Sequence, residues 1–530
     1  MKPDPRKKGV WFSLGGVLLL LVIWQFLSLF SGTNFLLPPP RDVLARFGQM
    51  FSEKEGWLAV IQSGERILQG VFFSAAVAVI FAFAVWRLKV LQRLIEPFVL
   101  LMKTVPIVSF ILIALFFLGN RVLTLFISGL VVFPMVYESV LAALSDVDHA
   151  LLEMARVFCL KKRDILRFII VPACRGQFLA AMGVALGMAW KAGVASEVLS
   201  LAKPSIGWHL HDSRLYLDME GLLAWTLAIV LVSFISEKLI ILVLRSALSY
   251  VGRKLPEKAR RVMHTAETLE ADVEQKSEHP PAITIDDEQC APQISDFLSE
   301  TSHSVTITID GAGECQKHQE RSDGMGHPAV ITIDGLDKAF GETVLFRNFS
   351  AELPLDRPFI VNGASGSGKT TLLRMLASLE RPDAGVISGV PGNGRFVFQE
   401  NRLIPQLSAR DNVRVVLPDY DGLRADALLQ RLDLSDVSGQ PAELLSGGEK
   451  RRVAIARALA PKSGILFLDE PLRELDEKRE TDAILLILEA FTRVPVILAA
   501  HDERLINKLN ARVLTLERLQ DRMSDIENTA

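Results

Sequence analysis

A glycine-rich stretch between two patterned segments constrains this chain more than any other part of its sequence. The apolar run Phe359–Val361 leads into Gly363–Thr370, which has the pattern G-x4-G-K-T, and the helical pattern Leu372–Leu376 follows directly. A strand, a glycine loop and a helix in this order bind phosphate, because backbone N–H groups and the helix N-terminus attract anions. The sequence therefore predicts a nucleoside triphosphate site. A glycine-rich turn that binds no nucleotide is the alternative.

The members of this loop have distinct expected roles. The Lys369 ammonium would contact the β- and γ-phosphates, and the Thr370 hydroxyl would bind Mg²⁺. The other residues of the loop that we expect to contact the nucleotide are Gly363, Ser365, Gly366, Ser367, Gly368 and Thr371.

A second pattern that suits nucleotide chemistry is an apolar run that ends in two acids. Ile465–Leu468 precedes Asp469 and Glu470, which is typical of a buried parallel strand whose carboxylates emerge at its C-terminal end. Asp469 would belong to the Mg²⁺ shell, and Glu470 would be the base that polarises water. Structural ion pairs are the alternative role for both carboxylates.

Composition separates the chain into two halves. Of the 530 residues, 50% are hydrophobic, which is too many for an ordinary soluble protein, and the excess lies in the first 250 residues. We therefore expect a membrane half in the lipid bilayer and a soluble half. The formal net charge of −3 argues against a nucleic-acid partner. The four cysteines show no zinc-site spacing, so reduced thiols are expected.

Six apolar runs are long enough to span a bilayer as helices. The first follows a basic start and is not followed by a small-residue cleavage site, so a retained span is expected and not a signal peptide. Basic residues concentrate in the loops on the face that the two termini share, which predicts that both termini are cytoplasmic. The expected spans are Val10–Phe30, Ile67–Val85, Pro97–Leu118, Val122–Val140, Phe178–Val198 and Leu222–Leu244.

Lys191 lies within the fifth expected span, where an ionisable group suggests a function. It could face a translocation path and attract an anionic solute. Alternatively, it could lie in a polar contact between helices, near a break at Gly193 and helped by Glu197.

A linker of different composition separates the halves. Between about residues 251 and 327, the motif Ile-Thr-Ile-Asp begins at Ile283 and Ile307, and a third copy begins at Ile331. We expect a duplication of the first strand of the soluble domain, with the third copy as the true strand and the rest as a largely disordered tether. A metal cluster of histidines and cysteines and a small solenoid are the alternatives.

Further motifs of the soluble half resemble those of ABC ATPases. Arg395–Pro405 resembles the glutamine loop, Leu445–Arg452 resembles the ABC signature, and Val494–Asp502 resembles the strand that ends in the switch histidine. The resemblance implies that Gln399 acts at Mg²⁺ or the attacking water, and that His501 contacts the γ-phosphate. It also implies ATP contacts for Phe340, Ser446, Gly447, Gly448 and Asp476. The chain departs from the family pattern at Glu449, Arg473, Glu474 and Leu505.

The first half resembles permeases of binding-protein-dependent ABC importers of the nitrate, sulfonate and taurine type. The loop Leu151–Arg167 is similar to their cytoplasmic EAA loop: Glu153, Ala155 and Val171-Pro172 match, whereas Met154 replaces an alanine and Cys159 stands where a glycine is expected. The resemblance also includes Leu36–Leu44 and Thr104–Pro106.

Together these resemblances imply an all-α polytopic domain over residues 1–250, the linker over 251–327, and an α/β P-loop NTPase domain of the ABC type over 328–530. The implied function is ATP-driven import of a small solute of the nitrate, sulfonate, taurine or pyrimidine-precursor class across the cytoplasmic (inner) membrane. The implied partners are a second copy of the chain and an extracytoplasmic solute-binding protein. An exporter half-transporter is the alternative, and the short loops between the spans argue against it.

Overall fold

The structure is a computed structural model that describes residues 5–30, 37–251, 255, 330–392, 394–461, 464–500 and 503–517. By its contacts the chain divides into two compact units. The helical unit comprises Met1–Val147 and Ile170–Tyr250, and the α/β unit comprises Asp148–Ile169 and Val251–Ala530. Residues 148–169, called the docking loop below, thus group with the α/β unit although helices of the other unit flank them in sequence.

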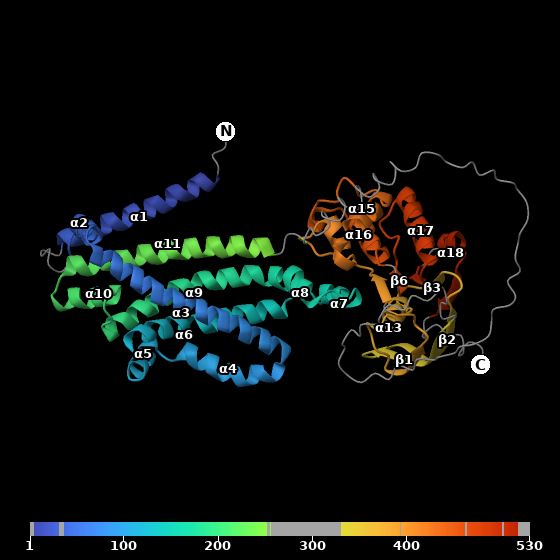
Figure 1. The fold of residues 1–530 in the computed structure, drawn as a ribbon, viewed down its shortest axis with the longest axis horizontal. Coiled ribbons are helices and arrows are strands. Elements are labelled where there is room, and N and C mark those ends of the chain that lie inside the picture. The colour runs from blue at the N-terminus through green and yellow to red at the C-terminus, as the bar shows by residue number, and fades with distance from the viewer. Residues whose placement is uncertain are drawn as a thin grey trace, which may run out of the picture. The chain divides into compact units, whose positions relative to one another are not determined.

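Helices make up the described part of the helical unit (Figure 1). They are α1 (Pro5–Phe30), α2 (Pro40–Ser52), α3 (Lys54–Arg87), α4 (Lys89–Thr104), α5 (Ile107–Leu115), α6 (Asn120–Ser145), α9 (Val171–Ser200), α10 (Ile206–Leu215) and α11 (Met219–Val251).

The core of this unit lies where α3 and α9 pack against α6. At the crossing of α3 and α6, a Cβ atom on Gly70 would lie 2.3 Å from the Leu125 carbonyl oxygen, so only glycine allows this approach. The Ser74 hydroxyl donates a hydrogen bond of 2.6 Å to the Gly129 carbonyl at the same crossing. Small residues and polar contacts between helices are how spanning helices associate when lipid provides no hydrophobic drive.

Length and apolar composition confirm most of the expected spans. Among the described residues, four helices could cross a membrane: Lys54–Arg87, Val122–Ser145, Lys162–Ser200 and Met219–Val251. The expected first span falls in α1, whose described apolar part is the shorter stretch Leu18–Phe30, so this span stays a prediction.

The expected third span is wrong as a single straight helix. The chain runs through α4 and α5 instead, and the two are bent by 100° at the break between them. Pro106 has no backbone N–H to continue α4, and Val105 before it takes an extended conformation with φ −74° and ψ 131°. The pair α4 and α5 forms either one broken span, which would bring the number of spans among the described residues from four to five, or a re-entrant loop.

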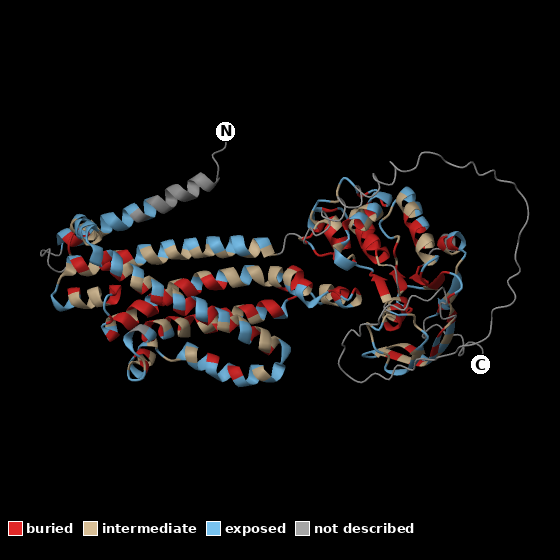
Figure 2. Ribbon diagram, viewed as in Figure 1, coloured by how far each residue is buried: buried red, intermediate tan, exposed pale blue. Residues whose placement is uncertain are grey.

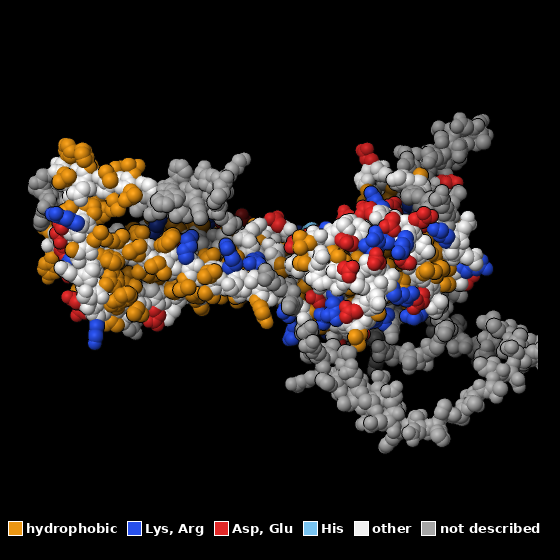
Figure 3. Space-filling view, turned by 90° about the horizontal axis from the view of Figure 1, so that it is seen from above, with side chains coloured by type: hydrophobic (Ala, Val, Ile, Leu, Met, Phe, Trp, Pro, Cys, Tyr) orange, Lys and Arg blue, Asp and Glu red, His pale blue; other side chains and the backbone are white. Residues whose placement is uncertain are grey.

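The two units differ in their surfaces. Large apolar side chains stand exposed along α1, α3 and α11, and most of the described part of α11 is exposed or half-buried (Figure 2). Hydrophobic side chains spread over the visible face of the helical unit, whereas basic and acidic side chains intermingle on the α/β unit (Figure 3). Exposed apolar surface of this extent suits contact with lipid.

The α/β unit contains two sheets. Strands β1 (Val330–Phe340), β2 (Thr343–Pro354) and β4 (Ala384–Ser388) form an antiparallel sheet in the order β2-β1-β4. Strands β3 (Phe359–Gly363), β5 (Gly394–Val397), β6 (Ile465–Asp469), β7 (Val496–Ala499) and β8 (Arg512–Leu516) form a parallel sheet in the order β5-β6-β7-β3-β8.

Helices complete the α/β unit. In the docking loop they are α7 (His149–Val157), α8 (Lys162–Ile165) and the π-helix η1 (Leu166–Ile170). Beyond the linker they are α13 (Lys369–Leu376), α14 (Ala409–Arg414), α15 (Gly422–Arg431), α16 (Gly447–Leu459), α17 (Glu477–Phe491) and α18 (Glu503–Leu509), with short 3-10 turns η2 (Pro418–Tyr420) and η3 (Ala442–Leu444).

Every residue of β6 and β7 is buried, as the continuous apolar runs predict for strands of a parallel sheet covered on both faces. Helix α13 packs against β3, β6 and β7, α16 against β5, and α17 against β7. The third copy of the repeat, Ile331–Asp334, lies in β1, which confirms that this copy forms a strand and the first one among the described residues. The copies at Ile283 and Ile307 lie outside the described residues.

Candidate functional site

The phosphate-binding loop lies between β3 and α13, as the sequence predicts. Gly363, Gly366 and Gly368 have φ values of 150°, 82° and 95°, which side chains rarely adopt. At Gly363 a Cβ atom would also lie 2.4 Å from the Leu516 carbonyl oxygen on the neighbouring strand β8. The glycines therefore let the backbone turn tightly at the end of a buried strand.

Lys369 is folded into this loop. It is buried, and its Nζ donates hydrogen bonds to the carbonyls of Gly363 (2.8 Å) and Ala364 (2.9 Å). Burial lowers the pKa of Lys369, while the charges of Glu470 and Asp469 act to raise it. The ammonium group thus lies inside the loop and near the two carboxylates that follow β6.

The carboxyl ends of adjacent parallel strands bring the predicted site residues together. Asp469 ends β6 and is almost fully buried, and the Thr370 hydroxyl donates a hydrogen bond to its carboxylate. Burial, followed by the charge of Glu470, raises the pKa of Asp469, against the influence of Thr370, Arg451 and Lys369. The expected Mg²⁺ ligands Thr370 and Asp469 are therefore direct neighbours.

No three His, Cys, Asp or Glu side chains in the described part of the chain are grouped so that they could hold a metal ion by themselves. Mg²⁺ is commonly held by one or two protein oxygens together with substrate phosphates. The adjacent oxygens of Thr370 and Asp469 fit that donor set.

Glu470 and Gln399 lie at the same edge of the sheet. Glu470 follows β6 with φ 47°, its side chain is three-quarters buried, and Arg473 Nη1 lies 3.6 Å from its carboxylate. Gln399 follows β5, the strand beside β6, and its side chain is exposed. His501 follows β7 on the other side of β6, but His501 lies outside the described residues.

Arg451 of α16 connects these strand ends, a role that its place in the sequence does not indicate. Its guanidinium is buried and donates to the backbone carbonyls of Phe398, Gln399, Asp469, Glu470 and Pro471. Burial lowers the pKa of Arg451 to about 10. The side chain fixes the ends of β5 and β6 relative to each other, so it positions Gln399 and Glu470. The motif pattern contains this arginine, but only the fold reveals which carbonyls it meets.

The signature segment begins α16. The Ser446 hydroxyl caps the helix by accepting from the Glu449 N–H, and the Glu449 carboxylate accepts from the Ser446 N–H (2.8 Å) and hydroxyl (2.8 Å). The Ser446 N–H is the leading cause that lowers the pKa of Glu449. Glu449, which departs from the family pattern, thus completes a capping box at the predicted anion site.

Glu474, another departure, lies at the same helix start. Its Oε2 would be 2.9 Å from a Cβ atom on Gly447, and its carbonyl oxygen 3.2 Å from one on Gly448. None of the contacts in the described residues joins Ser446, Gly447 or Gly448 to the phosphate-binding loop. Asp476 caps α17 by accepting from the Arg479 N–H (3.0 Å) and also pairs with the Arg479 guanidinium (2.6 Å).

The remaining predicted nucleotide contacts lie around the loop. Phe340 ends β1, is half exposed, and has Lys338 Nζ 4.9 Å from its ring centroid. Ser365 and Gly366 are exposed, Thr371 is half-buried in α13, and Ser367 is buried. The Ser367 hydroxyl has no hydrogen-bond partner among the described residues.

The docking loop contacts the rest of the α/β unit through one carboxylate above all. Glu153 of α7 accepts from Arg374 of α13 (2.5 and 3.3 Å) and from Arg402 (2.5 Å), which follows Gln399 by three residues. Partial burial acts to raise the pKa of Glu153, but the two arginines outweigh it and the pKa is lowered. Glu153 was expected to matter from its motif, whereas no pattern in the sequence indicates a role for either arginine.

Other contacts hold the docking loop in place. Asp164 accepts from the Tyr420 hydroxyl (2.9 and 2.8 Å), Gln406 donates to the Phe168 carbonyl, and Arg457 lies 5.1 Å from the Phe158 ring centroid. Cys159 has φ 49°, a left-handed conformation that glycine adopts without strain. This explains why the family pattern has a glycine at this position.

Within the helical unit, Glu197 and Lys191 both lie on α9 but do not contact each other. Glu197 is fully buried and accepts from the Ser63 hydroxyl (2.7 Å), the Gly207 N–H (3.3 Å) and Arg66 (3.4 Å). Lys191 is exposed on the same helix and has no hydrogen bond or ion pair with any described residue. The polar contact with Glu197 considered for Lys191 is therefore taken by Arg66.

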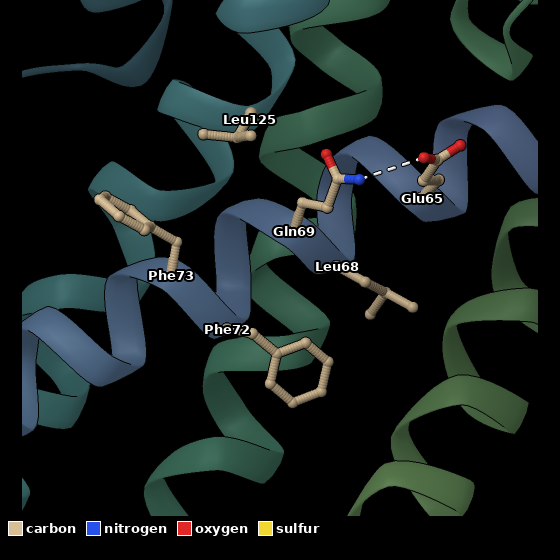
Figure 4. Close-up of a pocket in the computed structure, with 6 residues that line it drawn as sticks. All are labelled: Glu65, Leu68, Gln69, Phe72, Phe73 and Leu125. Carbon is tan, nitrogen blue, oxygen red and sulfur yellow. Dashed lines mark hydrogen bonds between the residues drawn. The ribbon is translucent and has the colours of Figure 1, made fainter.

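A hollow of a different kind lies on the outside of α3, beside α6 (Figure 4). It has a volume of about 700 Å³, and at its rim the Gln69 side chain donates a hydrogen bond of 3.1 Å to Glu65 on the same helix. The rest of its lining is apolar: Leu68, Phe72, Phe73 and Leu125. The two polar side chains of this hollow are bonded to each other, and the rest of its lining is apolar, so nothing in it suggests a nucleotide site.

Comparison with known families gives two matches in this chain. Residues 346–473 match the ABC transporter family, and residues 72–249 match the family described as binding-protein-dependent transport system inner membrane component. Both matches fall inside the domains expected from the sequence, whose boundaries stay predictions.

Proteins similar to the second half of this chain are named as ATP-binding proteins of importers. The aliphatic sulfonates import ATP-binding protein SsuB 1 of Rhizobium johnstonii is 37% identical over 204 residues, 36% of this chain and 74% of that protein. SsuB of Rhodopseudomonas palustris is 39% identical over 196 residues, 34% of this chain and 69% of that protein. A solved ATP-binding cassette with ADP and Pi is 25% identical, with 36% of this chain and 96% of that chain covered at a TM-score of 0.33.

Proposed function

The chain belongs to the ABC transporter family, as an importer permease fused to its ATPase, and on this premise we propose that two copies form one importer fed by an extracytoplasmic solute-binding protein. The observation that carries the proposal is the contact of Glu153 with Arg374 and Arg402. Through this contact the docking loop, which lies between two apolar helices in the sequence, reaches both α13, the helix after the phosphate-binding loop, and the segment after Gln399. Movement of the nucleotide site can thereby reach the spans.

The ATPase residues have the following proposed roles. The Lys369 ammonium and the loop N–H groups bind the phosphates, and Phe340 stacks on the adenine. Glu470 accepts a hydrogen bond from the attacking water, and Gln399 and His501 orient that water and the γ-phosphate. Mg²⁺, held by Thr370 and Asp469, would supply Lewis-acid stabilisation of phosphate charge. Arg451 keeps Gln399 and Glu470 in register through their backbone carbonyls.

A homodimer is proposed because one chain carries one phosphate-binding loop and one signature segment. In the family, ATP lies between the loop of one ATPase domain and the signature of the other, so two chains would form two sites. Asp476 would take part across that interface. Mixing inactive Lys369→Ala chains with inactive Ser446→Arg chains should restore ATP hydrolysis from one intact site. A fully active monomer in nanodiscs would contradict the dimer.

The proposed solute is a small anion, with a sulfonate as the favoured class. Relatives are named for aliphatic sulfonates, and Lys191 is an exposed cation of a predicted span without a partner among the described residues. Charges in spans face protein or water-filled paths and not lipid. Lys191 would therefore face the second copy and line a path whose charge attracts an anion. A neutral pyrimidine precursor is the second candidate.

The test of solute class is uptake into proteoliposomes with the solute-binding protein present. Lys191→Gln should reduce uptake of an alkanesulfonate by about tenfold or more, since a bond to a charged group is worth about 1.5–3 kcal/mol. Lys191→Arg should keep most of the uptake. Equal uptake by Lys191→Gln would exclude the lysine, and preference for a neutral pyrimidine would exclude the anion.

Direction is tested in vesicles of the opposite orientation, with ATP added outside, and topology is tested in spheroplasts. With the ATPase facing the outside of the vesicle, ATP should drive export from the lumen, where the binding protein is enclosed, to the medium. This corresponds to import in a cell. The exporter alternative predicts accumulation in the lumen. Both termini and the ATPase are proposed to be cytoplasmic in the inner membrane, so terminal tags should resist protease added outside intact spheroplasts.

A further inference from the structure

A second set of basic side chains lies at the opposite edge of the parallel sheet from the nucleotide site. Arg395 is at the start of β5, and Val494 and Pro461 come shortly before β7 and β6. These residues line a cavity of about 360 Å³ in the α/β unit. Its charged lining, called the arginine pocket here, consists of Arg395, Arg424, Arg431, Arg493, Asp421 and Glu489.

Arg395 is the innermost member of the arginine pocket. The residue is 5% exposed, and its Nη1 donates to the carbonyls of Pro461 (2.5 Å) and Ala458 (3.4 Å). Its Nε and Nη2 are buried and have no hydrogen-bond partner among the described residues. Buried donors of a charged group without an acceptor are costly, so their presence calls for a ligand or another specific cause.

The guanidinium groups of the arginine pocket lie close enough to affect each other. Burial lowers the pKa of Arg395 to about 10, and the charge of Arg424 contributes. Burial also lowers the pKa of Arg424, and the charge of Arg493 contributes. Arg424 thus lies close enough to repel Arg395 on one side and Arg493 on the other.

The acids of the pocket do not balance this charge. Glu489 pairs with both Arg431 (2.6 Å) and Arg493 (3.2 Å). Asp421 accepts from the Leu423 and Arg424 N–H groups as the cap of α15. Neither Arg395 nor Arg424 forms an ion pair with any residue that the structure describes. Four arginines face two carboxylates, which leaves an excess positive charge on Arg395 and Arg424.

We propose that the arginine pocket is a second anion site of the ATPase, separate from the nucleotide site, and that it binds a small tetrahedral oxyanion: phosphate, sulfate or a sulfonate group. The Nε and Nη2 of Arg395 form one edge of a guanidinium, which can bind two oxygens of such an anion when the side chains that bury these two atoms move apart. Arg424 and Arg493 supply the remaining charge from α15 and from the residues after α17. The bound anion connects β5 to these two helical segments.

The anion site is tested by calorimetric titration of the full chain in detergent, at constant ionic strength set with chloride. The background is Lys369→Ala, which weakens anion binding at the phosphate-binding loop. Sulfate, inorganic phosphate and methanesulfonate are titrated separately, and their relative affinities distinguish a phosphate site from a sulfonate site. We expect at least one of them to bind and to raise the unfolding temperature.

Variants of the other arginines of the pocket decide where the anion binds. Adding Arg424→Gln or Arg493→Gln should weaken binding by about tenfold or more, because each removes a charge-assisted contact. Adding Arg512→Gln on β8, an arginine outside the pocket, should leave the affinity unchanged. Absence of binding in the Lys369→Ala chain, or equal affinity in all three added variants, would overturn the proposal. The unfolding temperature in chloride alone checks that each variant is folded.

Discussion

Buried charge has different surroundings in the two units. In the helical unit, Glu197 is enclosed by hydrogen-bond donors on α3 and α10, and both of its carboxylate oxygens accept hydrogen bonds. In the α/β unit, Lys369 and Asp469 are buried to a similar degree, but the exposed residues Ser365 and Gly366 lie beside them. The first arrangement is closed and holds helices together, whereas the second is open to a ligand. Removing a charge should therefore affect folding in one unit and chemistry in the other.

The largest effect is expected for Glu470→Gln in the open arrangement. The amide cannot accept a proton from water, and loss of a general base reduces rates by about 10²–10⁴-fold. The ATPase rate should fall by that factor, while nucleotide binding and the unfolding temperature change little. Steady-state hydrolysis and ATP binding are measured side by side.

Two further variants sharpen this test. Glu480→Gln, at a partly buried acid paired with Lys508, should hydrolyse ATP normally. Asp469→Asn should weaken binding of Mg-ATP, because it removes a charge beside Thr370. Near-normal turnover of Glu470→Gln would show that another group activates the water.

The next effect is expected for the closed arrangement. Glu197→Ala leaves Arg66 buried without its acid, which costs about 3–5 kcal/mol of stability. The unfolding temperature of the chain in detergent should fall, while the KM for ATP stays the same. Replacing both partners, as Arg66→Met with Glu197→Leu, should recover much of the loss.

The control in the same unit is the exposed pair of Lys103 and Glu138, each 49% exposed. Glu138→Gln should cost less than about 1 kcal/mol, as is usual for exposed ion pairs. The comparison breaks if Glu197→Ala and Glu138→Gln have equal effects, or if Glu197→Ala changes the KM for ATP.

A smaller effect is expected for Glu153→Gln in the docking loop. The amide loses the charge that Arg374 and Arg402 contact, and a hydrogen bond to a charged group is worth about 1.5–3 kcal/mol. Solute uptake should fall by about tenfold while basal ATP hydrolysis persists. The matched control is Glu400→Gln, since Glu400 also lies near Arg402 (3.9 Å) but outside the docking loop. A parallel loss of hydrolysis and uptake would contradict a coupling role.

The smallest effect compares one substitution in both units. Cys159→Gly should stabilise the docking loop by a few tenths to about 1 kcal/mol, because it relieves the left-handed conformation at φ 49°. Cys174→Gly within α9 should destabilise by up to about 1 kcal/mol, since glycine weakens a helix. Differential unfolding temperatures measure both, and equal signs would refute the strain at Cys159.

The α/β unit follows closely from its sequence, because local patterns there specify both structure and chemistry. The run Ile465–Leu468 becomes a fully buried strand, and the acids after it meet the phosphate-binding loop because parallel strands share one edge. Even the glycine that the family pattern has at position 159 is explained by one backbone angle, the left-handed φ that Cys159 adopts in this chain.

Contacts between segments distant in the sequence could not be predicted in this way. The partners of Arg451 are backbone carbonyls, and the arginine partners of Glu153 are 221 and 249 residues away, so no pattern of residue types reveals them. In the helical unit, hydropathy predicts apolar length but not the bend at Val105-Pro106. The burial of Arg395 could also be recognised only from the structure, because arginine side chains are usually exposed.

The contact of Glu153 also limits how the two halves of this chain can be recombined. The Glu153 carboxylate contacts two separate segments of the ATPase, one through Arg374 and one through Arg402, so the contact depends on both arginines. A permease half grafted onto an ATPase that lacks either arginine would keep Glu153 but lose one of the two partners of its carboxylate. Interchangeable halves should therefore share all three residues, and engineering of hybrid transporters from this chain should exchange them as a set.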